Sequence, residues 1–305
     1  EKARRKRIRR LKFHRRNDQV DAMENNLLSF GHGYSAQALS KLLLPMGWKI
    51  TGTTRDSAKL DMLRNTGVTP VLWDSSDLDS ALTKATAVLI STSPDDAGDP
   101  VFLTYGADIL QIAPRLNWFG YLSTSGVYGD FKGDWVDEDT PANPTTRRGK
   151  MRLLAEQQWN GIEDLPLHIF RLAGIYGPGR GPFAKLRAGT AQRVNKPGQV
   201  FSRIHVADIA NTLAASILSP NSKGIYNLCD DDPAPPQDVI GYAAELLGLA
   251  LPPLVPFEEA NLSPMARSFY AENKRIRNDR IKKDLGVTLK YPSYKQGLKQ
   301  LIETE

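Results

Sequence analysis

Cysteine is nearly absent from this 305-residue sequence, in which Cys229 is the only one. A single thiol cannot form an intrachain disulfide, a zinc ribbon or a CxxC redox site, and such sparse cysteine use fits a reducing compartment. Long hydrophobic runs are also missing, because no apolar stretch approaches the roughly 18 residues that a membrane helix requires. These absences exclude an integral membrane protein and indicate a globular protein of the cytoplasm.

An excess of one charge sign is confined to the first 22 residues. These residues include ten Lys and Arg and three acidic residues, which gives the segment a charge of +7. Since the formal net charge of the whole chain is +6, the remaining residues carry a net charge of about −1. We expect residues 1–22 to be a disordered basic leader or upstream sequence outside the folded body. A nucleic acid or an anionic membrane surface is expected to bind only through this segment. If the segment is the remnant of a targeting leader, the expected location of the protein is an organelle matrix and not the cytoplasm.

From Asn25 onward, short apolar runs alternate with helical patterns, which is typical of βαβ units and a parallel sheet. Strands are expected at 27–30, 48–53, 70–73, 87–91, 118–122 and 167–172, and helices at 36–46, 57–65, 100–113 and 148–161. Beyond residue 175 the alternation of strand and helix patterns becomes irregular, and the sequence is rich in Gly and Pro. The sequence therefore predicts an α/β fold: a Rossmann-type doubly wound sheet in residues 23–175, and a smaller lobe in 176–305 that returns a strand or helix to the sheet.

A glycine-containing turn of the form GxGxxA follows the first expected strand. In this pattern the first glycine permits a tight turn, the second lets the backbone approach a pyrophosphate, and the small third residue lets the helix pack closely. We predict dinucleotide binding by Gly31, Gly33, Tyr34, Ser35 and Ala36. A purely structural tight turn is the alternative. His32 within the turn is expected to be exposed and not a metal ligand, and no metal site is expected.

The end of the second expected strand should distinguish NAD from NADP. An acidic residue about 20 positions beyond the glycines would bind the ribose 2′-hydroxyl of NAD, but the chain has Thr54 and Arg55 there. A guanidinium fork suits the 2′-phosphate of NADP. NADP is therefore the predicted cofactor and NAD the alternative. The competing interpretation makes Arg55 a surface arginine that pairs with Asp56.

Three later segments carry recognisable motifs: residues 122–129 read LSTSGVYG, residues 171–179 read RLAGIYGPG, and residues 204–210 read IHVADIA. Together these segments resemble the extended short-chain dehydrogenase/reductases, the group that includes nucleotide-sugar epimerases and dehydratases. The resemblance covers about residues 25–300. It implies an NAD(P)-binding oxidoreductase or epimerase fold, and a homodimer through the helices expected at 100–113 and 148–161.

The resemblance also implies roles for individual residues. Thr124 takes the position of the Ser or Thr that polarises the substrate carbonyl or hydroxyl, and Asp74 that of an aspartate that touches adenine. Lys150 falls where the family has the lysine of its YxxxK pair, beside the nicotinamide ribose. The tyrosine of that pair is replaced by Thr146. A threonine hydroxyl does not ionise usefully at neutral pH, so the usual acid/base is missing.

Three interpretations of this departure stay open. A substitute acid such as Tyr128, Tyr176 or His205 serves, the chemistry has changed, or the fold binds NADP without turnover as a scaffold or assembly subunit. The leading hypothesis is an atypical reductase or epimerase of a small polar or nucleotide-sugar substrate. Its candidate catalytic residues are Thr124, Thr146 and Lys150, and its candidate substrate contacts are Ser125, Arg180, Arg203 and Arg267.

Overall fold

The computed structural model describes residues 25–73, 75–219 and 222–304. The basic segment 1–22 and Asp74, for which the sequence predicted a leader and an adenine contact, lie outside the described residues.

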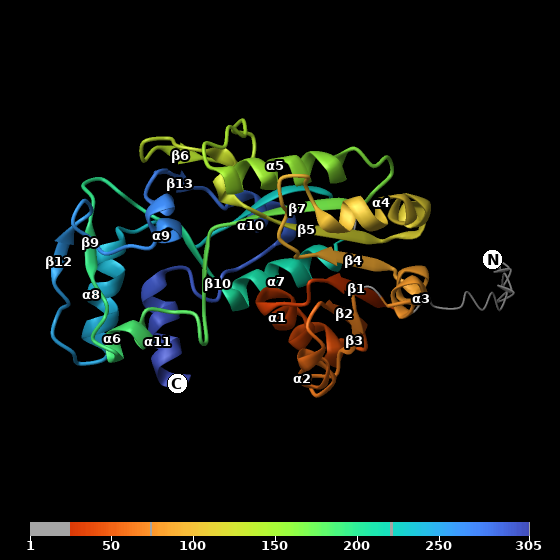
Figure 1. Ribbon diagram of the computed structural model, residues 1–305, viewed down its shortest axis with the longest axis horizontal. Helices are drawn as coiled ribbons and strands as arrows, with labels where there is room; N and C mark the ends of the chain where they lie inside the picture. The colour runs from red at the N-terminus through yellow and green to blue at the C-terminus, as the bar shows by residue number, and fades with distance from the viewer. Residues whose placement is uncertain (1–24, 74, 220–221, 305) are drawn as a thin grey trace, which may run out of the picture.

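Seven parallel strands form the central sheet, in the order β11-β7-β5-β4-β1-β2-β3 (Figure 1). Their bounds are β1 Asn26–Phe30, β2 Lys49–Thr54, β3 Thr69–Leu72, β4 Ala87–Ile90, β5 Trp118–Thr124, β7 Leu167–Leu172 and β11 Gly224–Leu228. The strand order reverses between β1 and β4, so the ligand crevice of such a fold is expected at their carboxyl ends. The predicted doubly wound α/β fold is confirmed.

Helices cover both faces of the sheet. On one face α1, Tyr34–Leu43, packs against α7, Val206–Ile217. On the other face α4, Pro100–Ile112, contacts both α3, Asp77–Lys84, and α5, Arg147–Asn160. Figure 1 shows the two groups on opposite sides of the strands. The short α2, Leu60–Arg64, follows β2. Helix α3 was not anticipated from the sequence.

The remaining elements build the lobe at the left of Figure 1. Its helices are α6 Phe183–Arg187, α8 Pro236–Leu246, α9 Pro264–Phe269 and α11 Tyr294–Thr304. Three pairs of short strands join it: β8 Gly174–Tyr176 with β10 Arg203–His205, β9 Arg193–Asn195 with β12 Leu254–Pro256, and β6 Trp135–Val136 with β13 Arg275–Ile276. Helix α10, Asp279–Leu285, contacts β11 and α7. The late strand β11 lies in the main sheet beside β7, so the division near residue 175 stays a prediction.

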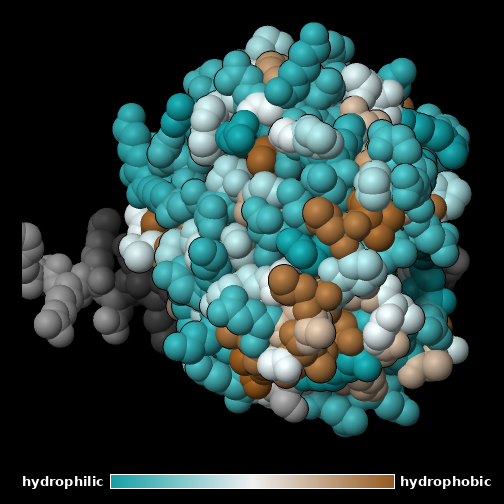
Figure 2. All heavy atoms as spheres, turned by 90° about the vertical axis from the view of Figure 1, so that its left-hand side faces the viewer, coloured by the Kyte–Doolittle hydropathy of each residue, from teal (hydrophilic) through white to brown (hydrophobic). Residues whose placement is uncertain are grey.

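The outer face of the lobe is mainly hydrophilic with a few hydrophobic patches (Figure 2). Exposed leucines near β12, Leu249, Leu251 and Leu254, contribute apolar surface to the lobe. None of the helices among the described residues has the length and apolar character needed to cross a membrane. The part of the chain that the structure describes also contains no group of His, Cys, Asp and Glu that could hold a metal ion.

Candidate functional site

The glycine turn joins β1 to α1 at the expected place. Gly31 has a φ of +70°, a conformation that favours glycine, and a Cβ added there would lie 3.0 Å from Cγ2 of Thr92. The Gly31 N–H donates to Oγ1 of Thr53 at 2.9 Å, which ties the turn to β2. This position therefore requires glycine both for its backbone conformation and for the close approach of the segment after β4.

The N-terminus of α1 opens from this turn with features that suit an anion. Gly33 is the N-cap residue and has no side chain that could cap the helix, and the first turn contains no acidic residue. A Cβ added to Gly33 would meet only the carbonyl oxygen of Gly31, at 3.6 Å, among the described residues. The first backbone N–H groups of a helix have no partner within it and bind phosphates well. The backbone of Tyr34, Ser35 and Ala36 therefore fits the diphosphate of a dinucleotide.

His32 is buried, so the expectation of an exposed side chain is wrong. Its ring lies under β2, where a Cβ on Gly52 would come within 2.7 Å of His32 Cγ, and its Nε2 contacts Oγ of Ser40 at 3.2 Å. Burial lowers the pKa of His32 to about 4, which keeps the ring neutral. Gly52 in β2 leaves space for the imidazole, and the buried His32 ring packs between the glycine turn and β2.

Arg55 stands exposed just after β2. The neighbouring Asp56 instead caps the following turn through Ala58 and forms an ion pair with Lys59 at 3.7 Å. The Oγ1 of Thr54 accepts a hydrogen bond from the Asp56 N–H at 3.1 Å. The Arg55 side chain has no hydrogen bond or ion pair to any described residue. The alternative pairing of Arg55 with Asp56 therefore does not occur, and this guanidinium is available to a ligand.

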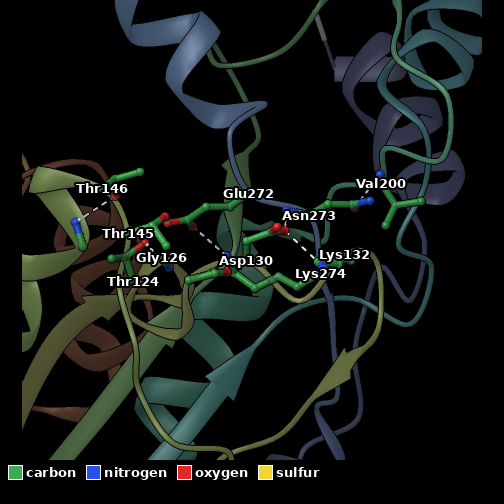
Figure 3. Close-up of polar contacts among 12 residues, drawn as sticks. Thr124, Gly126, Asp130, Lys132, Thr145, Thr146, Val200, Glu272, Asn273 and Lys274 are labelled. Atoms are coloured by element: carbon green, nitrogen blue, oxygen red, sulfur yellow. Dashed lines mark hydrogen bonds and ion pairs between the residues drawn. The ribbon is translucent and has the colours of Figure 1, made fainter.

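Thr124 and Thr146 come together at the carboxyl end of β5 (Figure 3). Oγ1 of Thr124 accepts from the Gly126 N–H at 3.2 Å and starts a short 3₁₀ turn, Ser125–Tyr128. Thr146 is the N-cap of α5, and its Oγ1 accepts from the Gly149 N–H at 3.2 Å. A Cβ on Gly149 would lie 2.6 Å from the carbonyl oxygen of Gly126. This close approach of α5 to the turn fixes both hydroxyls near the expected crevice, and Ser125 follows Thr124 as the first residue of the turn.

Lys150 lies four residues, about one helical turn, after Thr146. It is exposed and lines a surface groove of α5 whose other members are Asp96, Arg147, Met151 and Leu154. Two residues later, about 200° further round the helix, Arg152 reaches the strand ends: its Nη1 donates to the carbonyl oxygen of Leu122 at 2.8 Å. The role beside the nicotinamide ribose that the family resemblance implied for Lys150 stays a prediction.

The three substitute acid/base candidates are all buried. The hydroxyl of Tyr128 donates to Oδ1 of Asn227 at 2.7 Å, and burial raises its pKa to about 12. Burial also raises the pKa of Tyr176, whose hydroxyl contacts the Ser293 carbonyl oxygen at 3.4 Å. His205 caps α7 by accepting from the Ala207 N–H, and burial lowers its pKa to about 4. These surroundings fit packing and capping roles.

The predicted substrate arginines separate into two groups. Arg203 donates to the Phe201 and Ala234 carbonyl oxygens at 2.8 and 3.1 Å, and Arg267 donates to the Ala260 carbonyl oxygen at 3.0 Å. Both are therefore used inside the lobe. Arg180 is exposed and lies over the ring of Tyr34, 5.8 Å from its centroid. Of the three arginines, only Arg180 lies beside the glycine turn.

A short segment before β13, Glu272-Asn273-Lys274, crosses from the lobe to this corner (Figure 3). The Thr145 hydroxyl donates to Oε1 of Glu272 at 2.7 Å, and Nζ of Lys274 lies 2.8 Å from Oε2 of the same carboxylate. Lys274 also donates to the Gly129 carbonyl oxygen at 2.6 Å. The sequence analysis missed this connection because the partners are more than 120 residues apart and have no shared motif.

A buried ion pair anchors α5 on the sheet. Glu156 accepts from Nε and Nη2 of Arg171 in β7 at 3.2 and 2.8 Å, and both side chains are about 95% buried. Ser123 of β5 also donates to Glu156. Arg152 and Glu156 were not among the residues predicted from the sequence. Their spacing of four residues in the expected helix was the available signal, because i and i+4 share one helix face.

Comparisons with known proteins agree with this fold. No protein-family model matches the chain. The curated protein YeeZ of Escherichia coli K12 is 29% identical over 276 residues, which cover 86% of this chain and 94% of YeeZ. A solved structure from Silicibacter pomeroyi, described as a functionally unknown conserved protein, is 56% identical, with 92% and 99% of the two chains covered and a TM-score of 0.86.

Two further structures carry descriptions of a family. A proposed NAD-dependent epimerase/dehydratase of Methylobacillus flagellatus is 25% identical over 93% of this chain and 99% of its own, with a TM-score of 0.70. The human epimerase family protein SDR39U1, solved with NADPH, shares the fold at 17% identity and a TM-score of 0.73, with 92% of this chain and all of that chain covered. The chain is therefore similar in fold to extended short-chain dehydrogenase/reductases of the NAD-dependent epimerase/dehydratase type, the group that its three motifs resemble.

Proposed function

We propose that this chain binds NADP at the turn between β1 and α1 and acts on a small polar substrate at the carboxyl ends of β4 and β5, as an atypical reductase or epimerase. The observation that carries the proposal is the uncapped N-terminus of α1 behind Gly31 and Gly33, with Arg55, which has no partner among the described residues, at the end of the adjacent strand. Both features supply positive potential where a 2′-phosphorylated dinucleotide would lie. The human neighbour solved with NADPH supports the same cofactor.

Each part of the site has its own task in this proposal. The α1 backbone N–H groups hold the diphosphate, and Arg55 with Thr54 holds the 2′-phosphate. A bound nicotinamide supplies or accepts the hydride. The hydroxyl of Thr124 can still donate its proton while it accepts from Gly126. Thr124 therefore orients a substrate carbonyl, and Ser125 stands next to it.

A scaffold that binds NADP without turnover is the second candidate. The observation that favours it is that the candidate acid/base hydroxyls already have structural partners. The Thr146 hydroxyl caps α5, and the buried Tyr128 and Tyr176 hydroxyls form hydrogen bonds within the protein. A purified chain that retains NADP(H) but oxidises no NADPH with a panel of carbonyl compounds would favour the scaffold. A homodimer through α4 and α5 stays a prediction, and the exposed leucines there are Leu103, Leu110 and Leu154.

Replacing Arg55 with aspartate should weaken NADPH binding by roughly 10- to 100-fold, because it removes a charge-assisted contact and adds a repelling carboxylate. NADH has no 2′-phosphate, so its affinity should change much less. The matched control is Arg64→Asp on α2, which makes the same charge change at an exposed arginine paired only with Asp61. Calorimetric titration checks both variants. Equal losses in the two variants would reject Arg55 as the phosphate contact.

A further inference from the structure

Four cationic residues crowd the first six positions of α5: Arg147, Arg148, Lys150 and Arg152. The first turn of this helix contains no acidic residue. Because the N-terminus is the positive end of the helix dipole, cations there are unfavourable unless an anion offsets them. Arg147 has such an anion in Asp96, with an Nε–Oδ1 distance of 2.9 Å. Arg148 and Arg152 form no ion pair with any described residue.

Arg148 and Arg152 lie one helical turn apart and therefore share a face of α5. Glu156, one turn further along, binds Arg171 of β7 at 2.8 Å. This contact fixes the direction of the shared face, which is turned toward the sheet and the carboxyl ends of its central strands.

Arg152 is held at those strand ends through one nitrogen. Its Nη1 donates to the carbonyl oxygens of Leu122 and Thr92 at 2.8 and 3.1 Å and also contacts the Tyr121 hydroxyl. Its Nε and Nη2 have no hydrogen-bond partner among the described residues. Thr92 is the residue that Gly31 approaches so closely. Arg152 thus lies beside the turn between β1 and α1, and its Nε and Nη2 groups can still donate hydrogen bonds to a ligand.

Arg148 extends from the same face to the lobe. Its Cζ lies 5.7 Å from the ring centroid of Phe269 in α9, and Phe269 is 54% exposed. A guanidinium over an aromatic face is a favourable cation–π arrangement that leaves the edge N–H groups free to donate. The pair therefore presents a planar apolar ring and a cationic fork together, on the lobe side of α5.

The carboxylates of neighbouring elements are already engaged. Glu272 is paired with Lys274 at 2.8 Å and accepts from Thr145. Asp99 caps α4 through the N–H groups of Val101 and Phe102; burial raises its pKa, and the nearby charge of Arg152 partly offsets this. Neither carboxylate forms an ion pair with Arg148 or Arg152 among the described residues.

We propose that Arg148 and Arg152 bind an oxyanion of the substrate, a carboxylate or a phosphate, while Phe269 contacts a planar part of the same molecule. The inference rests on the proposed function, since it names the substrate class of that site. Guanidinium forks match both oxyanions in a bidentate manner, whereas a neutral carbonyl compound would leave the two cations uncompensated.

The test is calorimetric titration of the full chain, with and without saturating NADPH, with phenylglyoxylate, phenyl phosphate and the neutral methyl phenylglyoxylate. At least one anion should bind about tenfold tighter than the ester. Arg148→Gln and Arg152→Gln should each remove that preference. Arg147→Gln, the matched control on the neighbouring helix face, should change it less than about twofold. Comparing the acid with the phosphate ester identifies the oxyanion.

Different failures have different meanings. NADPH binding without preference for either anion, or equal losses in Arg147→Gln and Arg148→Gln, would overturn the anion site and leave the proposed function intact. Anion binding that depends on Arg148 in a chain that binds no NADPH would overturn the proposed function alone. Absence of both kinds of binding would reject both. The exposed Arg148 keeps the test valid if Arg152→Gln fails to fold, which its melting temperature reveals.

Discussion

Replacing Glu156 with alanine should lower the free energy of unfolding by about 3–5 kcal/mol. The variant leaves the guanidinium of Arg171 buried without its counter-charge, and it also removes the acceptor of Ser123. An uncompensated buried charge is far more costly than the loss of an attraction in water. Urea unfolding followed by circular dichroism measures the change. Binding of the anions proposed for Arg148 and Arg152 should fall as well, because this pair holds α5 and hence Arg152 against the strand ends.

An exposed ion pair on the same helix provides the matched control. Arg147 and Asp96 are 75% and 67% exposed, and solvent screening makes such pairs weak. Asp96→Ala should therefore leave the unfolding midpoint within experimental error of the unmodified protein. If Asp96→Ala and Glu156→Ala destabilise the chain equally, burial of the Glu156–Arg171 pair does not anchor α5.

Lowering the pH from about 6.5 toward 4 should destabilise the protein strongly. His32, His168 and His205 are buried, and burial lowers the pKa of each to about 4. In the unfolded chain they titrate near 6.5. Between these values the unfolded state binds more protons than the native state, so stability is fully present above pH 6.5 and is lost as the pH falls.

Buried carboxyl groups oppose this trend. Burial raises the pKa of Asp230 to about 8, so the native state holds a proton there that the unfolded state releases. Burial also raises the pKa values of Asp99, Glu138 and Asp208. The three histidines alone contribute a slope of at most about 4 kcal/mol per pH unit near pH 5, and the buried carboxyl groups make the measured slope smaller than this. Urea midpoints at pH 7, 6 and 5 give the slope. A midpoint that rises as the pH is lowered over this range would show that the histidines are charged in the native state.

The glycine turn and the strand–helix alternation were predictable because both depend on neighbouring residues. Gly31 and Gly33 stand between an apolar run and an amphipathic helix, and this local pattern already implies a phosphate-binding turn. The burial of His32 was not predictable in this way. It depends on the missing side chain of Gly52, twenty residues away, which only the pairing of β1 with β2 brings beside the imidazole.

The directions of the α5 side chains also could not be predicted from the sequence. A helix was expected from residue 148, and the structure starts it at Arg147 behind the cap Thr146. The pairing of Glu156 with Arg171, formed across β7, then selects which residues face the strand ends. Arg148 and Arg152 share the face of Glu156. Neither arginine belongs to a motif, so the direction of its side chain could not be predicted from the sequence alone.

The central claim is that the turn between β1 and α1 binds NADP. Its most direct test is calorimetric titration of the unmodified chain with NADPH and with NADH at physiological ionic strength. The account predicts saturable binding of one NADPH per chain, tighter than NADH by about tenfold or more because Arg55 contacts the 2′-phosphate. Equal affinity for the two cofactors would contradict the assignment of NADP, and the absence of binding to both would contradict the site itself.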